Sequence, residues 1–180
     1  MQKFTLVCTV VILSIFGSSA WAQEAETEVE EVHRYEPVEI NNSVVYILDS
    51  LKQYQHLWKL RLGDINKADR NFSNLKDDRL VWENYVNRKL AMVKGMNDSG
   101  GSSRLRGAIY TVLIHNKKML NTVAIPYEKL SSKAPIELLK KHLDAMHNFE
   151  KQELTYLDMV QAEQQIFAKK NKIILYEIIK

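Results

Sequence analysis

Cysteine, proline and glycine are scarce in this chain, and each shortage excludes a class of fold. The 180 residues contain one cysteine, Cys8, together with three prolines and six glycines. A single cysteine excludes both an internal disulfide and a structural zinc site built on several cysteines. The chain therefore contains few residues of the types that break helices, whereas Leu, Lys, Glu, Gln and Ala are abundant. This composition favours helix. The fold therefore depends on the packing of apolar side chains.

Long hydrophobic runs are also absent, except for one at the N-terminus. This run extends from Phe4 to Phe16, follows Lys3, and leads to Ala-Trp-Ala at residues 20–22. A basic start, a short apolar stretch and an A-x-A site are typical of a secretory signal peptide. The run is shorter than the about 20 residues that a membrane-spanning helix needs. We therefore expect residues 1–22 to be cleaved and the rest of the chain to be exported.

Cleavage after residue 22 also removes Cys8, so the exported chain has no thiol. An exported protein without disulfides is more typical of a bacterial periplasm than of a eukaryotic secretory route. Three Asn-x-Ser triplets, at residues 41, 71 and 97, leave eukaryotic secretion open. We expect a periplasmic or secreted protein, with a bacterial source favoured.

Charge is distributed unevenly along the exported chain. Residues 23–40 contain seven glutamates and one arginine, whereas the remainder has an excess of lysine and arginine. We interpret residues 23–42 as an acidic flexible arm. The arm either remains solvated or folds over the basic domain, and the basic surface would suit an anionic partner. Export argues against nucleic acid, while contact with a membrane or cell-wall surface stays open.

Residues 43–180 show the period of amphipathic helices. Apolar side chains recur every three or four residues in four segments, which places them on one face of each helix. The segments cover about residues 43–70, 76–96, 103–125 and 135–179. The sequence predicts an all-α fold, an elongated antiparallel bundle of three to four long helices without a sheet. Three helices result if the first two segments are continuous.

Local signals predict where these helices begin and end. Ser43 is a suitable cap for the first helix, and Pro126 is expected to end the third. Pro135 favours the start of the fourth, which carries a seven-residue apolar pattern. A lysine-rich break at residues 169–172 leaves two alternatives for residues 173–179, either more helix or a strand.

No motif for catalysis or metal binding is found. Only one of the five histidines, His33, follows a glutamate by three residues, whereas di-iron bundles use this spacing on two helices. His142 and His147 are five residues apart, a poor spacing for one face of a helix. No G-x-S-x-G sequence is present. We therefore predict a protein that is not an enzyme, with no metal site and no cofactor.

Aromatic residues recur in the first two helical segments. These residues are Tyr54, Trp58, Trp82 and Tyr85. Their spacing matches the apolar stripes, which is typical of core or groove lining. The functional alternative is that they line a groove that binds a small apolar or anionic ligand.

Two glutamates, Glu150 and Glu153, fall on the inward side of the fourth segment. One interpretation is a polar layer that is hydrogen-bonded inside the bundle or exposed where the helices splay apart. The other is a buried acid near His56 or Arg61 with a perturbed pKa.

These observations favour an exported interaction or scaffold protein. A long helix leaves part of its apolar stripe uncovered by shorter neighbours, and exposed stripes mark interaction sites. We expect it to bind another protein or a second copy of itself, and an accessory subunit of an envelope assembly is one such role. The alternative is a binding module for a small ligand.

Overall fold

A computed structural model of the chain describes residues 34–67 and 70–175. The expected signal peptide, most of the acidic arm and residues 176–179 of the last segment lie outside this part. The described residues form four long helices and no strand, which confirms the predicted all-α bundle. The long helices are α1 (Pro37–Lys67), α2 (Lys76–Gly95), α3 (Ser103–Met119) and α5 (Ile136–Asn171). A 3-10 turn (Phe72–Leu75) precedes α2, and a π-helical turn (Leu120–Ala124) joins α3 to the short helix α4 (Ile125–Glu128).

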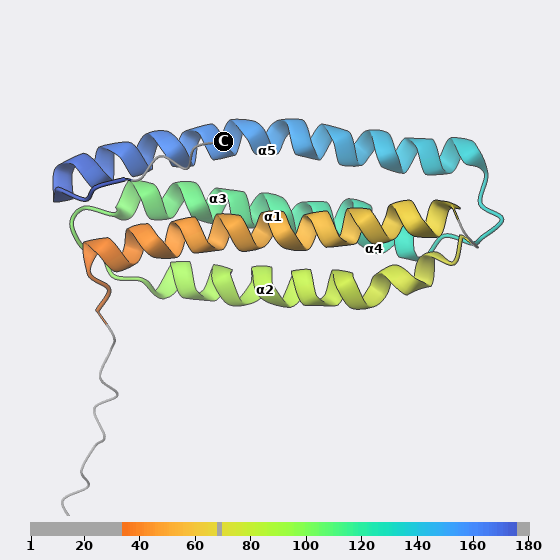
Figure 1. Cartoon of the computed structure of the whole chain (residues 1–180), viewed down its shortest axis with the longest axis horizontal. Helices are drawn as coiled ribbons and strands as arrows, with labels where there is room; N and C mark the ends of the chain where they lie inside the picture. Colours follow the sequence, from red (N-terminus) through yellow and green to blue (C-terminus); the bar gives the residue numbers. More distant parts are fainter. Residues whose placement is uncertain (1–33, 68–69, 176–180) are drawn as a thin grey trace, which may run out of the picture. The chain divides into compact units, whose positions relative to one another are not determined.

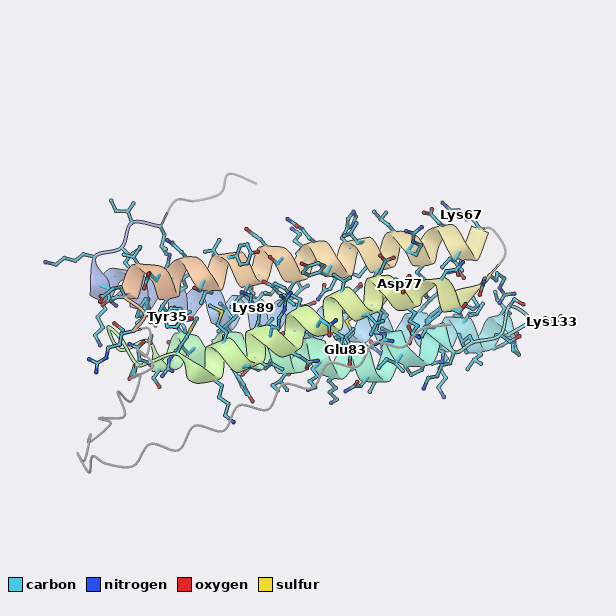
Figure 2. The ribbon with its side chains drawn as sticks, turned by 90° about the horizontal axis from the view of Figure 1, so that it is seen from below. Tyr35, Lys67, Asp77, Glu83, Lys89 and Lys133 are labelled. Carbon is cyan, nitrogen blue, oxygen red and sulfur yellow. The ribbon has the colours of Figure 1, made fainter. Side chains whose placement is uncertain are left out.

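Consecutive long helices run in opposite directions (Figure 1). Helix α5 packs mainly on α3, α3 also packs on α2, and α2 packs on α1. Contacts between α1 and α5 are sparse. Tyr35, just before α1, and Lys133, just before α5, lie at opposite ends of the bundle (Figure 2). The alternative with three helices is wrong, because α1 and α2 are separate and antiparallel.

The core forms where the predicted stripes meet. On α1 the fully buried side chains return every three or four residues, so they share one face. The buried apolar residues of α1 are Ile40, Val44, Ile47, Leu51, Trp58, Leu62 and Ile65. Trp58 lies at the centre, with its ring 6.4 Å from that of Trp82 and 6.2 Å, edge-on, from that of Tyr127.

Helix α1 begins at Pro37, earlier than the start expected near Ser43. Pro37 occupies a first helical position, where its missing N–H and fixed φ are favourable. The backbone N–H of Glu36 donates to the carboxylate of Glu39 at 2.8 Å, as in a capping box. The last part of the predicted arm therefore belongs to the bundle.

The helix that starts at Ser103 does not end before Pro126, contrary to the sequence prediction. A proline ring inside an α-helix clashes with the carbonyl of the fourth residue before it. Here the π turn widens the helix just ahead of the proline, and the N–H of Ile125 donates to the carbonyl of Leu120, five residues back. The wider turn accommodates Pro126, and the helix continues to Glu128.

Helix α5 ends at Asn171, inside the predicted lysine-rich break. Lys172 takes the left-handed conformation with φ 56°, and the N–H of Ile173 donates to the carbonyl of Ala168 at 2.9 Å. This is a Schellman-type ending that turns the chain away from the helix axis. Residues 173–175 form neither helix nor strand, so the seven-residue pattern does not continue as helix there.

Candidate functional site

A groove lies between α1 and α5. Because both helices pack on the inner helices more than on each other, the space between them stays open. At its centre lies a pocket of about 390 Å³ with apolar walls and a polar floor. The walls are formed by Leu48, Leu51, Val112, Leu154 and Leu157.

The floor of the pocket is a buried polar layer contributed by three helices. The carboxylate of Glu153 on α5 accepts hydrogen bonds from Gln55 Nε2 at 2.8 and 3.0 Å and from Asn116 Nδ2 at 2.8 Å. Gln55 lies on α1 and Asn116 on α3. Only 8% of Glu153 is exposed. A carboxylate this deeply buried requires such hydrogen bonds, because a buried acceptor without a donor destabilises the folded state.

The orientation of these amides is fixed by neighbouring groups. The indole Nε1 of Trp82 is only a donor, and it donates to Asn116 Oδ1 at 3.2 Å. Asn116 Nδ2 also donates to the carbonyl of Val112 at 3.1 Å. The oxygen of Asn116 is therefore the acceptor, and its nitrogen faces Glu153.

The pocket rim carries charges of both signs. Asp49 and Lys52 lie on the α1 side, and Lys59 forms an ion pair across the groove with Glu150. Within the described chain, no lysine, arginine or histidine forms an ion pair with Glu153. The rim cations therefore make no direct ion pair with the carboxylate at the floor.

A second hollow, of about 410 Å³, lies farther along, where α1 ends and α5 begins. It is lined by residues of α1, α4 and α5, and by Arg70. These residues are Asn66, Arg70, Tyr127, Ile136, Leu139, Lys140 and Leu143. The groove therefore follows the edge of α5 over much of its length.

The structure places Glu153 in a polar layer, because its side chain is buried and hydrogen-bonded to amides. The alternative of an acid beside Arg61 or His56 is wrong. Arg61 Nε instead pairs with Asp78 at 3.2 Å, and His56 is exposed. Glu150 lies at the rim rather than at the floor.

Sequence reasoning missed the other two members of the layer, Gln55 and Asn116. Both interrupt an apolar stripe. Gln55, for example, lies four residues after Leu51 and three residues before Trp58. A polar side chain on an otherwise buried helix face is the signal that identifies such residues.

The four aromatic residues named from the sequence lie in two places. Trp58 and Trp82 are fully buried in the core and expose no surface to a ligand. Tyr54 and Tyr85 contact each other, with ring centroids 4.9 Å apart, beside a shallow hollow at the α1–α2 edge. Burial raises the pKa of the Tyr85 hydroxyl above its ordinary value. Ligand binding by these aromatic residues stays a prediction.

The described residues contain no group of three or more acidic, histidine or cysteine side chains placed to hold a metal ion. Among the described helices, none is both long and apolar enough to cross a membrane. Comparison with known protein families, curated proteins and solved structures finds no match to this chain.

Proposed function

We propose that this protein is an exported helical interaction protein, an accessory subunit of an envelope assembly, that binds a helix of its partner in the α1–α5 groove. The partner is another protein or a second copy of the chain. The pattern at residues 1–22 supports export. An amphipathic helix that lays its apolar face into a hydrophobic groove is a recurrent mode of recognition.

The observation that carries the proposal is a row of exposed apolar side chains along the groove edge of α5. Ile136, Leu143 and Leu154 are all exposed, and Leu154 to the extent of 63%. They are separated by seven and eleven residues, which are close to two and three helical turns, so they share one face. A monomer has no packing reason to line up such residues beside an open groove, whereas a binding surface does.

The groove also has the lining that helix recognition requires. Leucines form its walls, and charged side chains of both signs form its rim, as at protein interfaces with an apolar centre and a polar edge. The buried amide and carboxylate layer ties α1, α3 and α5 together beneath it. A groove held open by such a layer is prepared for a partner before binding.

A single charged substitution on the groove edge tests the proposal. We expect the protein, isolated from cells that produce it, to run as a complex heavier than the monomer in size exclusion with light scattering. Leu154→Glu places a charge in the apolar interface and should convert most of the complex to monomer.

Leu57→Glu is the matched control. Leu57 is 53% exposed, and it is two residues from Gln55, which turns it by about 200° away from the groove. The control should leave the complex intact. A monomeric wild-type protein, or equal loss of the complex in both variants, would rule out the proposed interface.

A further inference from the structure

We propose that the central pocket of the groove binds a small organic cation, a primary ammonium on an aliphatic chain, with Glu153 as its anionic anchor. This inference goes beyond the proposed function, because it concerns a small ligand that occupies the pocket when no partner helix lies in the groove. Three features carry it: the charge balance of the pocket, the free acceptor capacity of Glu153 and the apolar walls.

The charge balance leaves Glu153 uncompensated. Four charged residues stand at the rim, and the two acids, Asp49 and Glu150, balance the two lysines, Lys52 and Lys59. Glu153 adds one further negative charge at the floor. A buried carboxylate without a cation is costly, so a positively charged ligand gains most from this position. An anionic ligand would meet three carboxylates.

The hydrogen bonds around Glu153 hold it as an acceptor. Both N–H groups of Asn116 Nδ2 are in use, one toward Val112 and one toward Glu153. Gln55 Nε2 donates to Asn116 Oδ1 and to the carboxylate. A carboxylate offers about four acceptor positions, and two amide nitrogens do not fill them. The remaining capacity suits the N–H groups of an ammonium.

The apolar walls of the pocket favour an aliphatic chain for the part of the ligand beyond its ammonium. Leucine and valine side chains surround the pocket, and its volume of about 390 Å³ is within the range of small-molecule sites. The rim ion pair between Lys59 and Glu150 lies beside the opening. The pocket therefore suits an unbranched aliphatic chain whose ammonium reaches the floor.

Calorimetric titration of the monomeric protein, separated from any partner by size exclusion, with hexylammonium tests the inference, with hexan-1-ol and hexanoate as probes of equal chain length. We expect hexylammonium to bind with a Kd that is roughly millimolar or tighter, and at least about tenfold tighter than the other two probes. The side-chain amide NMR signals of Gln55 and Asn116 should shift during the titration. Shortening the chain should weaken binding by about fourfold per methylene.

Glu153→Gln should weaken hexylammonium binding by about tenfold or more, since it removes the anchoring charge. Glu163→Gln is the control: it makes the same change on the same helix, about 15 Å farther along, where Glu163 pairs with Arg104. It should leave binding unchanged. Leu154→Ala keeps Glu153 and removes one exposed wall, so it should weaken binding by about threefold to fivefold.

Circular dichroism establishes that each variant remains helical. If Glu153→Gln does not fold, the probe series and Leu154→Ala decide the question. The inference is overturned if hexylammonium binds no tighter than hexan-1-ol, or if a folded Glu153→Gln protein binds it as well as the wild type.

Discussion

Replacement of Trp58 by alanine should lower the free energy of unfolding by about 3–5 kcal/mol. Trp58 is fully buried at the centre of the bundle, where its ring packs against Trp82 and Tyr127. The substitution removes these contacts and leaves a cavity that rigid helices close only in part. Urea unfolding followed by circular dichroism at 222 nm measures the loss.

Leu57→Ala is the control, because Leu57 is adjacent in the chain and 53% exposed. Its effect should stay within about 0.5 kcal/mol, apart from a small change in helix propensity. Similar losses in the two variants would mean that α1 does not turn Trp58 inward, and the described core would be wrong.

Replacement of Arg79 by methionine should destabilise the protein by about 3–5 kcal/mol. Arg79 on α2 donates to Glu128 on α4 at 2.9 and 3.2 Å, and it also pairs with Glu83. Burial alone would lower the pKa of Arg79, but hydrogen bonds and attraction from the two glutamates outweigh it, so the pKa is raised. The variant leaves the Glu128 carboxylate, whose side chain is 9% exposed, without its cation.

Thermal and urea unfolding should therefore show a large loss for Arg79→Met and little change for Arg88→Met, an exposed arginine on the same helix. Unfolding of Arg79→Met/Glu128→Leu should recover much of the lost free energy, because no charge is then left buried without a partner. If the double variant is no more stable than the single one, the unpaired carboxylate is not the cause of the loss.

The sequence predicts much of the fold because the helix period is local. Residues such as Val44, Ile47 and Leu51 repeat at steps of three and four, and the structure buries all of them. The predicted helix start near Ser43 and the predicted helix end before Pro126 are wrong because of local hydrogen bonding that the apolar pattern does not show. A helix begins at Pro37 because the carboxylate of Glu39 accepts a hydrogen bond from the backbone N–H of Glu36. Pro126 remains inside a helix because a π turn precedes it. A residue pattern does not reveal a turn that widens to fit proline.

The groove could not be predicted in the same way, because it depends on which stripes meet. The sequence indicates which face of α5 points inward. It does not indicate that this face packs on α3 and makes few contacts with α1. Gln55, Asn116 and Glu153 are separated by 61 and 37 residues along the chain, and only the packing brings them within hydrogen-bond distance. Their shared feature, a polar residue on an apolar face, was recognised for Glu153 alone.

Photocrosslinking from the groove edge tests the central claim most directly. A benzoylphenylalanine at position 154 reports what lies against the groove in the cell that produces the protein, and the same residue at position 57 reports on the opposite side of α1. If a partner helix lies in the α1–α5 groove, irradiation should give a discrete crosslinked product from position 154 and none from position 57. No product from position 154, or the same product from both positions, would contradict it.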